Sequence, residues 1–302
     1  MLKQNTLKKE YYFEGKGLHT GKWAKMTLRP SVADSGIVFR RTDLGNAEIP
    51  ALAENVSNTA RSTTISCGEA SVVTIEHIMS ALTGLGVDNA VIDIDGAEVP
   101  ILDGSARPYV ECISADGVRE LDEFRKPVEI DREIYISNEK TGSYIRITPS
   151  DHMEIKLKID FDSKVLGVQT ADWDESVDYA KEVAPCRTFV FFHEIEFLAK
   201  QGLVKGGDIS NAIVIVEHPV TEEQVSSLCE LMGIPPLRVT DSGYLNNLDL
   251  HFPDECGRHK LLDLIGDIRL AGGWMNARIE AFRPGHTINT NAAKAVRKAL
   301  NL

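Results

Sequence analysis

Apolar side chains recur every three or four residues in two stretches of the chain, and this period predicts a helix in each. In residues 74–84 the apolar positions share one helix face: Ile75, Ile78, Met79 and Leu82. In residues 258–267 the apolar positions are Leu261, Leu262, Leu264 and Ile265. A proline and two acidic residues just before the second stretch are typical of a helix start. We therefore expect two helices, each with one buried side.

Alternating apolar and polar positions, or short apolar runs, predict strands on both sides of these helices. In the first half the expected strands are residues 10–14, 23–29, 37–40, 63–66 and 90–95. In the second half they are residues 153–161, 184–192, 212–216 and 274–282. The glycine-rich residues 15–21 do not lead into a helix, so they predict a turn between strands rather than a dinucleotide-binding loop.

Four further helices are expected: a short one from residue 106, and residues 193–201, 221–232 and 292–300. Thr221 and Gln224 have the spacing of a capping box. Residues 120–127 are charged and contain a proline, which favours a linker. His286 directly follows a Pro-Gly turn, so it is expected in a loop at the end of a strand.

The two halves of the chain follow the same order of elements. Each has strands, then a helix with a histidine near its start, then another strand, with His77 in the first half and His259 in the second. This repeat predicts an α+β fold of two similar domains, residues 1–124 and 125–302. Their helix layers are expected to pack together, with the sheets outside.

Composition narrows the class of protein. The chain has 302 residues and a net charge of −12, which argues against a nucleic-acid partner because phosphate binding requires a basic surface. The N-terminus has no secretory signal, and no apolar stretch is long enough to insert stably in a bilayer. Five scattered cysteines without a CxxC motif predict a reduced, cytoplasmic protein.

His259 and Asp263 are four residues apart and project from one helix face. On spacing alone this pair is more typical of an ordinary surface contact than of a metal site. If the fold brings His77 close, two histidines and one aspartate would leave one position for water, which is the pattern of a catalytic zinc. A structural zinc would usually have cysteine ligands, and no cysteine is placed for it.

Three more residues are candidates for proton transfer. Glu76 adjoins His77 and could accept a proton from a metal-activated water, although a solvated helix glutamate is the commoner case. His286 could transfer protons from its position in the loop, or it could simply be a polar residue at the tip of that loop. Asp267, one turn beyond Asp263, could orient an imidazolium ring.

Five blocks in this order along the chain resemble the UDP-3-O-acyl-N-acetylglucosamine deacetylases, zinc amidases of lipid A synthesis in Gram-negative bacteria. The blocks are VTIEHIMSALTGLGVDNAVIDIDGAEVPILDGSA (residues 73–106), RTFVF (187–191), GLVKGGDISNAIV (202–214), DECGRHKLLDLIGDIRLAG (254–272) and GHTIN (285–289). GKGLHTG near the start resembles the opening motif of the family. Together the blocks are specific, although each alone is not.

The resemblance implies two β-α-α-β domains with the active site at their junction. It assigns the metal ligands to His77, His259 and Asp263, the general base to Glu76, and the general acid and oxyanion partner to His286. It further implies that Asp267 pairs with that histidine, that Thr188 donates to the oxyanion, and that Lys260 lies near the substrate. Further substrate contacts are expected from His19, Thr64, Phe189, Phe191 and Phe197.

The family also has an insert that forms an apolar passage for the acyl chain, which falls near residues 193–206 of this sequence. Two departures stand out: residues 217–247 are longer than expected and contain their own helix, and Thr64 stands where some relatives have a cysteine. Some members are fused to a following hydroxyacyl carrier-protein dehydratase, whereas this sequence runs to Leu302.

The expected reaction is hydrolysis of the acetamide of a UDP-3-O-acyl-N-acetylglucosamine by a monomeric enzyme. Zinc is the expected metal, and iron(II) suits the same ligands. Either Glu76 or His286 delivers the proton to the leaving amine. Two alternatives remain at this stage: a binding module whose metal is structural, and a metal amidase acting on another N-acyl sugar.

Overall fold

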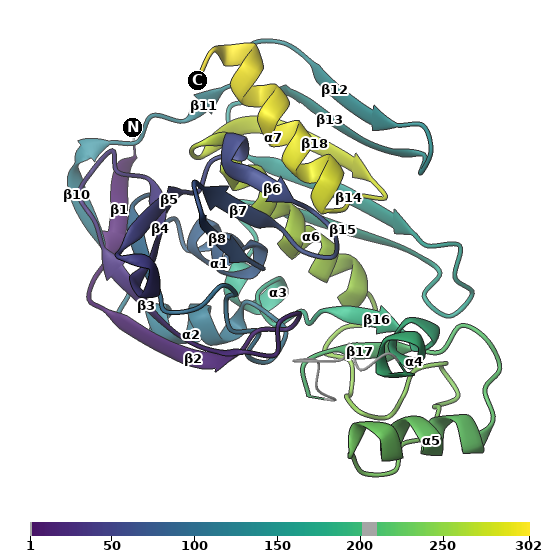
Figure 1. Cartoon of the computed structure of the whole chain (residues 1–302). Coiled ribbons are helices and arrows are strands. Elements are labelled where there is room, and N and C mark those ends of the chain that lie inside the picture. The colour runs from purple at the N-terminus through teal and green to yellow at the C-terminus, as the bar shows by residue number, and fades with distance from the viewer. Residues whose placement is uncertain (1, 201–209) are drawn as a thin grey trace.

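The structure is a computed structural model that describes residues 2–200 and 210–302. Its two main sheets have the same strand order (Figure 1). The first sheet runs β2 (Tyr11–Lys16), β3 (Trp23–Pro30), β9 (Ala90–Ile94), β4 (Ile37–Arg41) and β5 (Ala47–Pro50). The second runs β12 (Ile134–Asn138), β13 (Ser143–Pro149), β18 (Met275–Phe282), β14 (Glu154–Asp160) and β15 (Val168–Asp174), with β11 (Val128–Glu129) also paired to β18.

The parallel pairs show that the repeat extends to strand direction. Within each five-strand order a single pair is parallel, β4 with β9 in the first sheet and β14 with β18 in the second, and both occupy the same position in the order. The sequence prediction of an α+β fold with two similar halves is therefore confirmed. Strand β14 shows the expected alternation, with Ile155, Leu157 and Ile159 buried and the lysines between them exposed.

Helices follow the strands in matching places. The central pair is α1 (Glu76–Gly84) and α6 (Glu255–Ile268), while α2 (Arg107–Ser114) follows β9 and α7 (His286–Leu300) follows β18. These helices lie between the two sheets (Figure 1). One continuous cluster of buried apolar side chains extends through both halves. The arrangement of helices inside and sheets outside is the one that the sequence predicts.

Smaller elements complete the chain. Strand β1 (Lys3–Leu7) pairs with β10 (Val118–Phe124), and a three-stranded sheet contains β6 (Val56–Asn58), β7 (Thr64–Cys67) and β8 (Ala70–Val73). The remaining elements are α3 (Tyr179–Glu182), β16 (Phe189–Phe191), α4 (Phe192–Lys200), β17 (Ile213–Ile215), α5 (Glu222–Met232) and the 3₁₀ turns Thr42–Leu44, Ala53–Asn55 and Arg269–Ala271.

Four sequence expectations need correction. Helix α1 begins at Glu76 rather than at residue 74, because Thr74 has a positive φ of 61°. The apolar run 184–192 forms a strand only at Phe189–Phe191. Helix α7 begins at His286, so this histidine is the first helical residue and not a loop tip. The fourth correction concerns the expected linker, 120–127. The expected helix stop at Gly202 and the end of the predicted insert 193–206 lie outside the described residues.

The expected linker is largely a strand, because β10 uses residues up to Phe124 to pair with β1. The residues after it are also held in place. Arg125 donates to the carboxylate of Asp88 at 2.8 Å and lies 4.8 Å from the ring centre of Trp274. Arg125 therefore holds the connection between the halves against the residues just before β9 and just before β18.

The central helices α1 and α6 approach closely at Gly266. A Cβ atom at this position would lie 2.1 Å from the carbonyl oxygen of Glu76 and 3.1 Å from the backbone nitrogen of Ser80. Both neighbours are backbone atoms, so they cannot move aside as a side chain can. The absence of a side chain at Gly266 therefore sets the distance between the two helices, and with it the distance between the residues that they carry.

We predict that Gly266→Ala destabilises the fold by about 1–3 kcal/mol, the usual cost of overpacking, despite the better helix propensity of alanine. The matched control is Gly273→Ala, whose Cβ would meet its nearest atom at 3.8 Å. Denaturant unfolding should show a change within about 0.5 kcal/mol for the control. Equal stability of the two variants would show that the helices do not depend on this contact.

Candidate metal centre and active site

The crossing of α1 and α6 brings three metal-ligand side chains together. His77 from α1 and His259 and Asp263 from α6 each offer one atom, and these atoms lie within 4.8 Å of one another. Asp263 Oδ1 is 3.6 Å from His77 Nε2 and 3.5 Å from His259 Nε2. All three side chains are buried. The sequence predicted these residues on two separate helices, and the structure brings them together in one cluster.

The chemistry of this cluster fits a divalent metal. Asp263 Oδ1 is buried and has no hydrogen-bond partner among the described residues, which is costly for a carboxylate oxygen unless a cation completes it. Burial lowers the pKa of His77 to about 3, so its ring is neutral, as metal binding requires. Burial alone would raise the pKa of Asp263, but the charge of Lys260 holds it below its usual range. Two imidazole nitrogens and one carboxylate oxygen are the donor set of an open catalytic zinc site.

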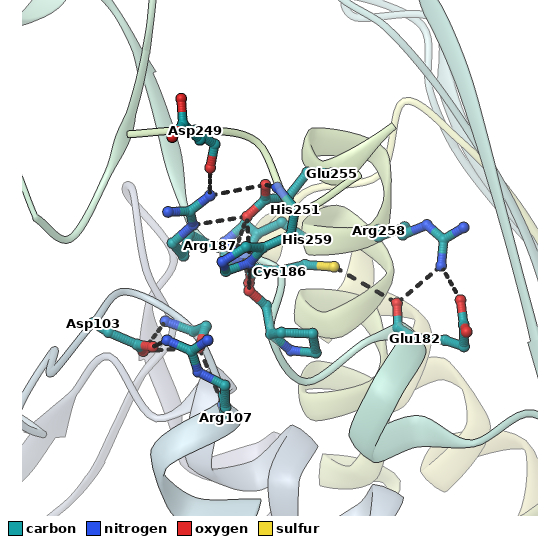
Figure 2. Close-up of polar contacts among 12 residues, drawn as sticks. Asp103, Arg107, Glu182, Cys186, Arg187, Asp249, His251, Glu255, Arg258 and His259 are labelled. Carbon is teal, nitrogen blue, oxygen red and sulfur yellow. Dashed lines mark hydrogen bonds and ion pairs between the residues drawn. The ribbon is translucent and has the colours of Figure 1, made fainter. Parts of the chain in front are cut away.

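The orientation of His259 is set by the chain next to α3. Its Nδ1 lies 3.0 Å from the carbonyl oxygen of Cys186, which can only accept, so Nδ1 carries the proton and Nε2 is left free for a metal (Figure 2). The residue after Cys186 fixes this carbonyl. Arg187 donates through Nε to Glu255 Oε1 at 2.8 Å and through Nη2 to Asp249 O at 2.6 Å.

Arg187 and Glu255 form a buried ion pair, with exposed side-chain fractions of 7% and 0%. Glu255 also accepts from the backbone N–H of His251. Burial alone would raise the pKa of Glu255, but its hydrogen bonds with Arg187 lower it, so the pair is charged. Figure 2 shows that this pair ties the first turn of α6 to the loop that supports the metal-ligand histidine.

Glu76 is held beside the ligands by a neighbouring strand. Its Oε2 accepts the backbone N–H of Thr63 at 3.0 Å, and Oε1 lies 3.9 Å from His286 Nε2. Burial raises the pKa of Glu76 to about 8, an effect that the charge of His286 partly offsets. A carboxylate with a raised pKa in a cleft is suited to proton transfer near neutral pH.

His286 faces Glu76 from the first turn of α7 and is oriented by Asp267. Its Nδ1 donates to Asp267 Oδ2 at 3.0 Å, while Thr63 Oγ1 and Asn289 Nδ2 donate to the same carboxyl group at 2.5 and 3.0 Å. Burial alone would lower the pKa of His286, but the charge of Asp267 raises it to about 9. The imidazolium is therefore the resting form at neutral pH.

One cavity of about 440 Å³ contains the whole cluster and extends beyond it. Its polar end is lined by the three ligands with Glu76 and His286. Its other walls are mostly apolar and include Phe161, Val190, Val214 and Met232. A site with one reactive end and a long apolar end suits an amphipathic ligand.

Most residues predicted to contact substrate line this cavity: His19, Thr188, Phe189, Phe191 and Lys260. Lys260 donates to Asp263 Oδ2 at 2.8 Å and lies 5.4 Å from the ring centre of Phe189. Phe197 is 60% exposed on α4 and is not a lining residue. Thr64 is buried on β7 and does not line the cavity, whereas its neighbour Thr63 contacts both Glu76 and Asp267.

Two structural roles were missed from the sequence. Thr63 donates to both Glu76 and Asp267, and only its place at the start of the expected strand 63–66 could have drawn attention to it. Glu98 is buried and accepts the backbone N–H groups of His19 and Thr20 and the hydroxyl of Thr74. These hydrogen bonds hold the glycine-rich loop against the Glu98 carboxylate and so position His19 at the cavity.

Among the described residues, no helix has both the length and the apolar character needed to cross a bilayer.

Comparison with known proteins gives matches over nearly the whole chain. The model of a family described as UDP-3-O-acyl N-acetylglycosamine deacetylase (LpxC) matches residues 4–230 and 237–298. A UDP-3-O-acyl-N-acetylglucosamine deacetylase of Cellvibrio japonicus is 41% identical over 298 residues, which cover 97% of this chain and 90% of the relative. The long stretch 217–247 is thus matched except at residues 231–236.

Other relatives are longer than this chain. A bifunctional LpxC/FabZ enzyme of Porphyromonas gingivalis is 42% identical over 99% of this chain, and one of Bacteroides thetaiotaomicron is 43% identical over 100%. The chain spans 65% and 66% of their lengths. The family match, with the histidine–aspartate cluster at its centre, shows that this chain belongs to the UDP-3-O-acyl N-acetylglycosamine deacetylase family.

Proposed function

We propose that this chain is a zinc-dependent deacetylase that hydrolyses the acetamide of a UDP-3-O-acyl-N-acetylglucosamine to the free amine and acetate, a step of lipid A synthesis in Gram-negative bacteria. The observation that carries the proposal is the single cavity in which a three-ligand metal cluster, a buried glutamate and a buried histidine share space with an apolar wall. An amide would bind at the reactive end of this cavity, and an acyl chain would bind at its apolar end.

His77, His259 and Asp263 would hold the zinc ion, which supplies Lewis-acid charge at the polar end of the cavity, and iron(II) suits the same ligands. Glu76 then accepts a proton from the attacking water. Its carboxylate is fixed by the N–H of Thr63, so the oxygen that faces His286 is directed into the cavity. Fixed geometry of this kind removes the entropic cost of placing the base.

His286 is the hydrogen-bond donor next to Glu76 at the polar end of the cavity. Its Nε2 faces the site and is charged at neutral pH because Asp267 stabilises the imidazolium. Together with Thr188, it stabilises the oxyanion of the tetrahedral intermediate, and one such donor contributes on the order of 3 kcal/mol. The leaving amine takes its proton from Glu76 or from His286, whose facing atoms are 3.9 Å apart at the polar end of the cavity.

The rest of the substrate matches the other walls. Lys260 lies near the metal cluster, and Arg61 lines the cavity with its side chain 47% exposed, so both are cations available to the diphosphate. Phe189 and Phe191 lead from this end to the apolar wall. The five cysteines are free, which suits the cytoplasm, where thiols stay reduced.

We predict that Glu76→Gln retains its zinc but loses turnover by about 10²–10⁴-fold, the usual contribution of a general base. The assay is acetate release from UDP-3-O-acyl-N-acetylglucosamine, with metal content measured on the same sample. The matched control is Glu111→Gln, which makes the same change at an exposed helix carboxylate outside the cavity lining and should stay within about threefold. Wild-type protein that releases acetate only from a different N-acetyl sugar would overturn the proposed substrate, and full turnover by Glu76→Gln would overturn the base.

We predict that Asp267→Asn moves the alkaline limb of the pH–rate profile to lower pH by about 1–3 units, the range that one adjacent charge produces. The pKa of His286 is raised by Asp267, so removing this charge lets the ring lose its proton at a lower pH. The measurement is kcat/KM for acetate release against pH. Asn289→Ala, which removes a neutral donor but keeps the charge of Asp267, should leave the limb in place. An unchanged limb in Asp267→Asn would contradict the role of His286.

A further inference from the structure

We propose that α5 and the turn after it form the far wall of the apolar cavity and set the length of the acyl chain that the enzyme accepts. The inference rests on the proposed function, because it assigns a role to the part of the same cavity that does no chemistry. Figure 1 shows α5 beyond β16 and β17, on the side of these strands away from α1. The residues that carry the proposal are Leu228, Met232, Ile234 and Leu237.

The wall belongs to the same cavity as the metal cluster. Leu228, Met232, Ile234 and Leu237 line it on the α5 side, as Val190 does from β16. The metal ligands and Glu76 line its other end. An acyl group that enters from the reactive end therefore extends toward α5, and the side chains of this helix are the surface that its terminus meets.

Helix α5 is held by a small core of its own. Val225, Leu228 and Cys229 are buried together with Phe192 and Val214 in a cluster separate from the main core of the protein. Met232, Ile234 and Leu237 are only partly buried and pack on the edge of this cluster. The wall thus consists of a buried cluster with partly exposed residues packed against it. Met232, Ile234 and Leu237 can therefore be substituted without removing the buried cluster that supports α5.

Both ends of α5 are fixed by their capping. Thr221 and Gln224 form the capping box predicted from the sequence. At the other end Gly233 has a φ of 65°, its N–H donates to Glu230 O, and Ile234 N–H donates to Cys229 O at 3.0 Å. This pair of bonds is a Schellman motif, which reverses the chain in a defined geometry. The positions of Met232 and Ile234 relative to the cavity are therefore specified by the backbone.

The wall includes the stretch that the family model does not match. The family model matches up to residue 230 and again from residue 237, and Met232 and Ile234 lie in the unmatched stretch 231–236. The residues of the metal cluster all lie in matched stretches. The reactive end thus follows the family model, whereas this part of the apolar wall does not, as expected of a determinant of chain length that differs between family members.

The test is the dependence of kcat/KM on acyl length, measured as acetate release from UDP-3-O-acyl-N-acetylglucosamines with saturated chains of increasing length. Each methylene that gains an apolar environment raises kcat/KM by about fourfold until the chain meets the wall. Met232→Ala and Leu237→Ala should move the optimum to chains about two carbons longer, and Met232→Trp should move it to shorter chains. Leu231→Ala is the matched control, because Leu231 adjoins Met232 but is 57% exposed and does not line the cavity.

The outcomes separate the inference from the function on which it rests. Absence of acetate release by the wild-type enzyme at every chain length would overturn the proposed function. Wild-type release with the same length profile in all wall variants would overturn the role of α5 and leave the function standing. A uniform loss at every length in Met232→Ala also counts against the inference, because a chain-length determinant changes the profile. Shifts of opposite direction in Met232→Ala and Met232→Trp, with Leu231→Ala unchanged, support it.

Discussion

The close crossing of α1 and α6 at Gly266 is the constraint on which the site depends. The ligands come from helices in different halves of the chain, His77 from the first and His259 and Asp263 from the second. Neither helix holds a three-ligand set alone. Because a Cβ atom at position 266 would overlap the backbone of Glu76, the contact places this glutamate and its neighbour His77 at a fixed distance from α6. A repeat of two similar units thus becomes one reactive centre at their junction.

This position also explains the electrostatics. Glu76, Asp263, Asp267 and His286 are buried at the helix crossing, and Lys260 is partly buried beside them. Burying charges is costly, and two of the carboxylates have a cationic partner: Asp267 pairs with His286 and Asp263 with Lys260. The oxygen Asp263 Oδ1 is the exception among the described residues of this cluster, and it points to a cation as the missing partner. Burial makes the glutamate a stronger base by raising its pKa, whereas the charge of Asp267 keeps the histidine protonated as an acid.

The sequence predicted the central strands of both sheets and the two central helices because their apolar periods are regular, but it did not predict β12, β13 and β15 of the second sheet. It did not predict that Glu76 and His77 would be buried, since they lie off the apolar stripe of α1 and are covered by segments distant in the sequence. His286 was expected in a loop because the preceding Pro-Gly was interpreted as a turn, although it directly precedes a helix. Thr64 was expected to contact the substrate, but side chains of adjacent residues in an extended segment point to opposite sides, and it is the hydroxyl of Thr63 that reaches Asp267. These errors share a cause: each depends on contacts between distant segments, which local patterns do not contain.

The central claim is that His77, His259 and Asp263 together hold a catalytic zinc ion. X-ray absorption at the zinc edge, with metal content measured on the same purified protein, tests it most directly. The account predicts one zinc ion per chain with only nitrogen and oxygen ligands at about 2.0–2.2 Å, and loss of most of the metal in Asp263→Ala. A sulfur ligand, or full zinc content in Asp263→Ala, would contradict it.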